Sequence, residues 1–241
     1  MTVDFFKFPH TPHLKWLGAG VPRDDKVMSP PEADALLQRC VVVEEKVDGT
    51  NLGFSTDAHG GIRVQNRGNW VRQGGHPQFD ALWGWLALRQ AALVDALGDN
   101  LILFGEWCLA VHSVQYDSLP DWFLGFDVYD RRKRAFWSVP RRDKLLRSVG
   151  LAGVQKLASG LFSVHELEAL LSRASAVGGR SVEGIYIRAD EGDWLKDRAK
   201  IVRAEFTQAI EEHWSKRRME RNRVALQQDK PWQNKEPSGR R

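Results

Sequence analysis

The sequence predicts an α+β fold with largely antiparallel sheets flanked by helices. The chain contains many short runs rich in β-branched and aromatic residues, and several longer stretches with apolar residues at helical spacing. The two kinds of segment do not alternate strictly, as they would in a parallel α/β sheet. A length of 241 residues is enough for one sizeable core.

The individual elements follow from these patterns. Apolar spacing and start signals predict helices at about residues 30–39, 78–96, 140–148, 164–174 and 206–226. Two of these helices follow Ser29 and Ser138 and have proline near the first turn. Strands are predicted at residues 41–45, 51–55, 62–65, 101–105, 122–129, 184–187 and 200–202.

Positive charge is concentrated at the C-terminus. Residues 215–241 contain nine Lys/Arg and three Asp/Glu, a net charge of +6, which leaves −2 for residues 1–214 out of the total of +4. Such a basic arm is typical of a segment that binds nucleic acid phosphates, although a solvated tail that binds nothing would have the same composition. Residues 227–241 are expected to form a frayed end.

Several classes of protein are disfavoured. No apolar run approaches the ~20 residues that span a bilayer, so no membrane partner is expected. The first residues lack a basic region followed by an apolar stretch, which favours a cytoplasmic location. No Cys or His spacing suggests a zinc site. The oligomeric state stays open.

The strongest local motif surrounds Lys46. An apolar strand ends in Glu45 and Lys46, and Asp48 and Gly49 then form a turn into the next strand. A lysine at a strand end becomes a nucleophile when burial and nearby cations lower its pKa. Gly49 would allow the backbone to approach a ligand closely. A surface lysine on a hairpin turn remains the alternative, because Asp-Gly is a common hairpin signal.

Five further motifs follow in order, each with a charged or aromatic residue at a strand end or turn. They are centred on Arg67 (N-R-G), Glu106 (F-G-E), Phe126 (F-D-V), Glu183 (E-G-I-Y-I) and the cations Lys196, Arg198 and Lys200. Together with Lys46 they offer a nucleophile, carboxylates for a metal, an aromatic face for a base and cations for phosphates. Nucleotidyl transfer to an amine requires these parts.

The ordered motifs resemble the covalent nucleotidyltransferase superfamily, which comprises ATP-dependent DNA ligases, RNA ligases and mRNA capping enzymes. The forms E-K-V-D-G-T-N, F-G-E and F-D-V resemble most the RNA ligase 2-like group. The likeness covers roughly residues 41–206. It implies an ATP-grasp-like DNA/RNA ligase adenylation domain over residues 1–206. Residues 207–241 would form a basic C-terminal helix and tail, without an OB domain.

The resemblance also implies roles for single residues. Lys46 would be the catalytic residue that carries AMP, Phe126 would stack on adenine, and Arg67 would contact the sugar and 5′-phosphate end. The last motif is usually two lysines separated by one residue, so its register lies at Lys196 and Arg198 or at Arg198 and Lys200. The other implied nucleotide-binding residues are Glu45, Asn51, Glu106 and Glu183, and of these Glu106 and Glu183 would also bind metal.

The implied function is that of an ATP-dependent RNA ligase with ATP and Mg²⁺ or Mn²⁺ as cofactors. AMP would pass from Lys46 to the 5′-phosphate of an RNA, and a 3′-hydroxyl would then displace it; a nicked duplex is one candidate substrate. Two alternatives stay open. One is a capping-type guanylyltransferase that uses the same lysine, and the other is a non-enzymatic nucleic-acid-binding module on a ligase fold.

Overall fold

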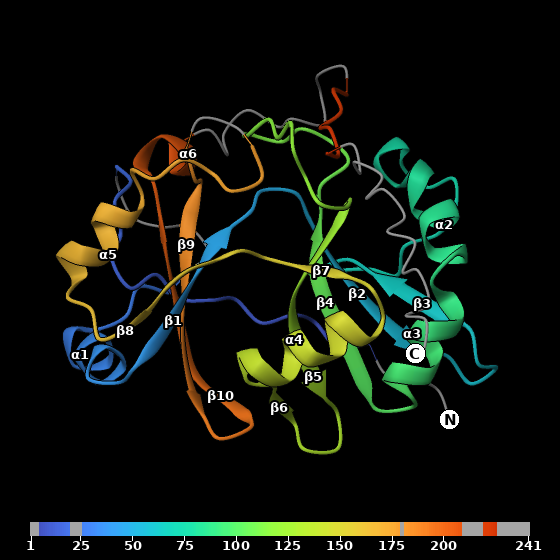
Figure 1. Ribbon diagram of the computed structural model, residues 1–241, viewed down its shortest axis with the longest axis horizontal. Coiled ribbons are helices and arrows are strands. Elements are labelled where there is room, and N and C mark those ends of the chain that lie inside the picture. Colours follow the sequence, from blue (N-terminus) through green and yellow to red (C-terminus); the bar gives the residue numbers. More distant parts are fainter. Residues whose placement is uncertain (1–4, 20–25, 179–180, 209–218, 226–241) are drawn as a thin grey trace, which may run out of the picture.

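Two largely antiparallel sheets make up the protein, with helices on their outer sides and one helix, α4 (Val139–Ser148), near the middle of the view (Figure 1). The computed structural model describes residues 5–19, 26–178, 181–208 and 219–225. The first sheet has the strand order β10-β9-β1-β8, and the second has the order β3-β2-β4-β5-β6. A short strand, β7 (Ala152–Gly153), pairs in parallel with β5 in the second sheet. The predicted α+β class with largely antiparallel sheets is confirmed.

The first sheet has one apolar face and one charged face. Its strands are β1 (Val41–Lys46), β8 (Lys156–Gly160), β9 (Gly184–Glu191) and β10 (Trp194–Val202). Val41, Val43 and Ile187 belong to a core that includes residues of α1 (Pro30–Leu37) and α5 (Val164–Leu170). Because side chains alternate along a strand, Glu44 and Lys46 lie on the opposite face, toward the second sheet.

The second sheet is arranged in the same way. Its strands are β2 (Thr50–Thr56), β3 (Ile62–Gln65), β4 (Leu101–Trp107), β5 (Phe123–Asp130) and β6 (Ala135–Phe136). Leu52, Phe54 and Leu103 share a core with η1 (Pro77–Phe79), α2 (Asp80–Ala87) and α3 (Gln90–Leu97). Alternation therefore directs Asn51 and Glu106, which are paired across β2 and β4, toward the first sheet.

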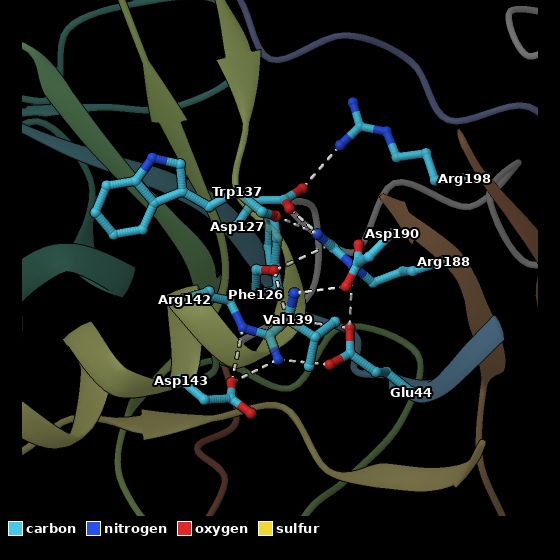
Figure 2. A network of polar contacts seen from close by, with 10 residues as sticks. All are labelled: Glu44, Phe126, Asp127, Trp137, Val139, Arg142, Asp143, Arg188, Asp190 and Arg198. Atoms are coloured by element: carbon cyan, nitrogen blue, oxygen red, sulfur yellow. Dashed lines mark hydrogen bonds and ion pairs between the residues drawn. The ribbon is translucent and has the colours of Figure 1, made fainter. Parts of the chain in front are cut away.

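A buried network of ion pairs connects the two sheets (Figure 2). Glu44 of β1 accepts two hydrogen bonds, at 2.6 and 3.1 Å, from Arg142 of α4 (Val139–Ser148). Asp127 of β5 accepts one from Arg188 of β9 at 2.6 Å and one from Arg198 of β10 at 2.7 Å. These five side chains are at most 10% exposed. The network therefore fixes the charged face of the first sheet against β5 and α4.

All seven predicted strands are present, with longer bounds in several cases. The prediction of one helix over 78–96 is wrong, because the chain breaks between α2 and α3. Arg89 donates hydrogen bonds to the carbonyl oxygen of Trp85 and to Asp121, and these bonds hold the break. The apolar spacing continues across the break because both helices pack on the same core. Helix α5, predicted over residues 164–174, ends at Leu170.

The prediction of a helix over 206–226 is also wrong in its described part. A short helix, α6, covers Ala204–Gln208, and residues 209–218 lie outside the described residues. Residues 219–225 are extended and form β-bridges through Arg221 to Ala110 and through Val224 to Leu119. Backbone contacts with distant segments produce no local pattern in the sequence, so these bridges could not be predicted from the apolar spacing. The domain boundary after residue 206 stays a prediction. No helix in the described ranges is long and apolar enough to cross a membrane.

Replacing Arg142 with Ala is expected to lower the free energy of unfolding by about 3–5 kcal/mol. The change removes both hydrogen bonds that Arg142 gives to the buried Glu44 and leaves it only the longer contact with Arg188 Nε at 3.8 Å, and an undercompensated buried charge is costly. Urea denaturation measures the loss. The control is Arg132→Ala, which breaks an exposed pair with Asp99 and should cost no more than about 1 kcal/mol. Equal losses for the two variants would contradict the role given to the network.

Candidate active site

Lys46 is the last residue of β1 and is paired with Glu183. Its ammonium Nζ donates to both carboxylate oxygens of Glu183, at 2.6 and 2.8 Å. The Lys46 side chain is 20% exposed and that of Glu183 9% exposed. Glu183 directly precedes β9, whose first residue, Gly184, lies opposite Lys46 in the sheet. Sheet pairing thus brings together two motifs that lie 137 residues apart.

The charge state of Lys46 follows from its neighbours. Burial alone would lower its pKa, but the carboxylate of Glu183, followed by other groups including Asp48 and Glu106, outweighs burial and raises the pKa above its ordinary value. Lowering the pKa of Lys46, which nucleophilic attack requires, therefore depends on bound cations and not on the residues around it. Acidic groups surround the amine, and they favour its charged form.

Burial and mutual repulsion oppose ionisation of the acidic groups around Lys46, and a bound cation would favour it. Burial raises the pKa of Glu106 to about 8, and the charges of Asp48 and Glu183 add to this effect against that of Lys46. Burial likewise raises the pKa of Glu183, with Lys46 acting in the opposite direction. One Glu106 carboxylate oxygen also accepts a hydrogen bond from the Gly49 backbone at 3.2 Å. The site is therefore suited to bind positive charge.

Asp48 is a site residue for which the sequence analysis gave no role beyond the turn. Its Oδ2 accepts hydrogen bonds from the backbone N–H and the hydroxyl of Ser113, both at 2.6 Å, and from Val114 N–H at 3.3 Å. Its own N–H donates to the Tyr116 hydroxyl at 2.9 Å. Residues 108–116, here called the covering loop, therefore hold the turn that follows Lys46.

Asn51 and Arg67 lie near the same cluster. The Asn51 Oδ1 atom is buried and has no hydrogen-bond partner among the described residues, which leaves an acceptor for a ligand. Arg67 is exposed in a turn in which Asn66 Oδ1 accepts bonds from the Gly68 and Asn69 backbones. The charge of Arg67 acts on Glu106, so the turn places Arg67 at the border of the site.

Phe126 occupies an irregular position in β5. Gly105 pairs with Gly125 and Phe104 pairs with Asp127, so Phe126 is the extra residue of a β-bulge. The Phe126 carbonyl oxygen accepts bonds from Arg142 and Arg188, and its ring meets the edge of Phe8 at a centroid distance of 5.4 Å. The side chain is only partly buried, which leaves ring surface for the implied contact with a base.

Glu45, which the resemblance implied as a nucleotide-binding residue, does not lie with Lys46 in the structure. As a neighbour of Lys46 on one strand, it projects from the opposite face. Its carboxylate accepts hydrogen bonds from the Ser175 hydroxyl and from the Ala176 backbone N–H at 3.0 Å. The side chain is thus bound to the loop after α5 and does not line the charged face on which Lys46 lies.

The structure also separates the three cations of the last motif. Lys200 is buried, and its charge lowers the pKa of Glu183, which places it with Lys46. Arg198 is committed to Asp127 at 2.7 Å and packs against the rings of Phe8 and Phe136, so it does not bind phosphate in this arrangement. Lys196 pairs with Glu191 near the end of the β9–β10 hairpin and is half exposed. Of the three, only Lys200 belongs to the site.

Two facing sheets, with a partly buried lysine and carboxylates between them, define a nucleotidyltransferase-type domain. A family model described as RNA ligase matches residues 39–202, which is more than half of the chain. The chain belongs to the RNA ligase family. A search of curated proteins finds no match.

Solved structures of a Naegleria gruberi RNA ligase share the fold. The enzyme with PPi has 19% identity and a TM-score of 0.59, over 85% of this chain and 64% of that one. A mutant with ATP and Mn has 19% identity and a TM-score of 0.58, over 83% and 63%. A second mutant with ATP and Mn has 18% identity and a TM-score of 0.56, over 76% and 55%. The chain thus spans less than two thirds of the Naegleria chains.

The raised pKa of Glu106 predicts how stability changes with pH. Between its ordinary pKa of 4.5 and about 8, the folded protein keeps a proton that the unfolded chain releases, so the free energy of unfolding should fall as pH rises through this window. Glu106→Gln removes the titration. Its Tm should therefore increase relative to the wild type between pH 5 and pH 8, by about 2–4 °C for each kcal/mol.

Thermal melting followed by circular dichroism at pH 5, 6.5 and 8 measures this effect. The control is Glu191→Gln, the same change at an exposed residue of the β9–β10 hairpin. A Tm difference for Glu106→Gln that stays constant over the three pH values would contradict the burial assigned to Glu106.

Proposed function

We propose that this chain is an ATP-dependent RNA ligase that forms a covalent lysyl-AMP intermediate on Lys46. The observation that carries the proposal is the partly buried pair of Lys46 with Glu183 among further carboxylates, in a chain of the RNA ligase family. Lysine in such a setting serves as a nucleophile once it loses its proton. The Naegleria enzymes solved with ATP and Mn, which share the fold, support ATP as the nucleotide.

The reaction begins with the proton on Lys46. Glu183 lies 2.6 Å from Nζ and has a raised pKa, so it is placed to accept that proton. The neutral amine then attacks the α-phosphorus of ATP, a nitrogen–phosphorus bond forms, and the bond to the pyrophosphate leaving group breaks. Lys200, on the same face as Lys46, provides positive charge for the phosphates.

The next two steps transfer AMP and seal the ends. An oxygen of the RNA 5′-phosphate attacks the phosphorus of lysyl-AMP, which frees Lys46 and leaves AMP on the RNA end. A 3′-hydroxyl then attacks the 5′-phosphorus, and AMP leaves as the phosphodiester forms. Arg67, exposed at the border of the site, is suited to contact the 5′-phosphate end.

The carboxylates fit a divalent cation such as Mg²⁺ or Mn²⁺. Glu106 and Glu183 offer oxygen donors. Burial, with the charge of Asp48 added, raises their pKa values, and a bound cation would favour their ionised forms. Within the described ranges no three His, Cys, Asp or Glu residues form a ligand group, so phosphate and water oxygens would complete the coordination. When bound, the cation offsets triphosphate charge and weakens the field that keeps Lys46 protonated.

Labelling with nucleotide tests the first step. With Mg²⁺ and ATP labelled at the α-phosphate, the wild-type protein should acquire an acid-labile, base-stable label, and Lys46→Ala should acquire none. Labelled GTP, offered separately, should give little product. Preferential labelling by GTP would indicate a capping-type guanylyltransferase. RNA binding without any covalent label would indicate a binding module on a ligase fold.

The position of Lys200 predicts the register of the last motif. Lys200→Ala should slow lysyl-AMP formation by about 100-fold or more, because a phosphate-binding cation is lost next to the reacting atoms. Lys196→Ala should label at the wild-type rate, because Lys196 pairs with Glu191 at the hairpin end. Single-turnover labelling with excess ATP measures both. A strong defect in Lys196→Ala with a normal Lys200→Ala would reverse the assignment.

Sealing assays test the substrate. A nicked duplex, a tailed end and a single-stranded RNA, each with a 5′-phosphate and a 3′-hydroxyl, should be compared with DNA of the same sequence. RNA strands should be joined and the Lys46→Ala protein should join none of them. Sealing of DNA alone would contradict the proposed class of substrate.

A further inference from the structure

The extended segment 219–225, here called the C-terminal strap, lies against the covering loop at the top of Figure 1. Asn222 is its buried residue, only 3% exposed. The Asn222 Oδ1 atom accepts from Tyr116 N–H at 2.7 Å, and Nδ2 donates to the carbonyl oxygens of Cys108 at 2.8 Å and Ala110 at 3.2 Å. One amide therefore joins the two ends of the covering loop.

The strap backbone repeats this pattern. Asn222 N–H donates to Leu109, and Arg223 N–H donates to Tyr116, at 3.0 and 2.9 Å. Val111 N–H donates to the Glu220 carbonyl oxygen at 3.0 Å. The side chains of Arg221 and Arg223 are exposed. The strap thus contacts the loop through its backbone and the buried Asn222 side chain, and Val224 packs against a core that includes Cys108 and Val114.

The middle of the same loop binds the turn that carries the nucleophile. Ser113, Val114 and Tyr116 hold Asp48, two residues after Lys46. The polar groups that Asn222 satisfies are buried, so breaking these bonds without replacement is costly and favours opening of the loop. An opened loop would release Asp48, and a displacement of about 1 Å near reacting groups can cost about 100-fold in rate.

We propose that the C-terminal strap acts as a clasp for the covering loop, with Asn222 as the positioning residue that keeps Asp48 and the Lys46 turn in place. The proposal rests on the proposed function, because its kinetic readout is lysyl-AMP formation. The strap reaches the nucleophile through two sets of hydrogen bonds, from Asn222 to the loop and from the loop to Asp48.

Two substitutions of Asn222 test the clasp. Asn222→Ala removes all three side-chain bonds, and Asn222→Asp keeps the acceptor for Tyr116 but turns an oxygen toward two carbonyl oxygens. In single-turnover labelling with ATP and Mg²⁺, both should lower the maximal rate of lysyl-AMP formation by about 10- to 100-fold. The ATP concentration that gives half the maximal rate should change less. The matched control is Arg223→Ala, which keeps the strap backbone and should label at the wild-type rate.

A double-mutant cycle separates positioning from general loss of stability. Ser113→Ala removes the hydroxyl bond to Asp48 and should slow labelling in the wild-type background. If Asn222 acts through the covering loop, Ser113→Ala should have a much smaller effect in the Asn222→Ala background. Additive effects of the two substitutions, or a wild-type rate for Asn222→Ala, would overturn the proposal.

Hydrogen exchange tests the clasp without any reaction. In the wild type, the amides of Ser113, Val114 and Arg223 should open as one unit with the same dependence on denaturant. In Asn222→Ala, the Ser113 and Val114 amides should exchange faster while that of Phe104 in β4 is unchanged. If Asn222→Ala fails to fold, the wild-type measurement decides, because separate opening of strap and loop would overturn the proposal.

The two proposals fail in different ways. A wild-type protein that takes no label from ATP would count against the proposed function, and exchange would still test the clasp. A wild type that labels normally, together with an Asn222→Ala variant that labels equally fast and exchanges equally slowly at Ser113, would refute the clasp alone.

Discussion

The buried ion pairs between the sheets are the constraint on which the site depends. Glu44 is bound by Arg142, and Asp127 by Arg188 and Arg198, with each side chain almost fully removed from water. Buried charges are tolerated only when well paired, so the relative placement of β1, β5, β9 and α4 admits little variation. Glu44 is two residues before Lys46 on the same strand face. The ion pairs that fix the position of Glu44 therefore also fix how Lys46 lies relative to the second sheet.

Neighbouring regions of the same face handle charge in different ways. Around Glu44 and Asp127, arginines match the carboxylates, and the group is electrostatically satisfied. Around Lys46, Asp48, Glu106 and Glu183 lie close together without matched arginines, and burial raises the pKa values of Glu106 and Glu183. The first arrangement serves rigidity. The second retains a capacity for added positive charge, which a metal ion arriving with a nucleotide would supply.

The sequence predicted seven of the ten strands in the described residues, and the principal motifs, because both depend on local patterns; β6, β7 and β8 were missed. Apolar alternation predicts β1 and β9, and the order of the motifs alone indicates that Lys46, Glu106 and Glu183 act in one site. The face on which Glu45 lies could have been predicted from strand alternation, whereas motif order alone suggested a pocket residue. The roles of Arg198 and Asn222 could not be predicted, because each depends on partners more than 70 residues away. Long-range polar pairing leaves no periodicity in a sequence.

The pairing of Lys46 with Glu183 also determines how the resting protein meets other reagents. An ammonium group has no lone pair, and here it is largely shielded from solvent by its partner. Acyl phosphates, aldehydes and similar electrophiles in a cell react with neutral amines, so exposed lysines are modified more readily than this one. The contact with Glu183 keeps Lys46 protonated and therefore protects it from these reagents. Lys46 becomes reactive only when a ligand changes the charge around it.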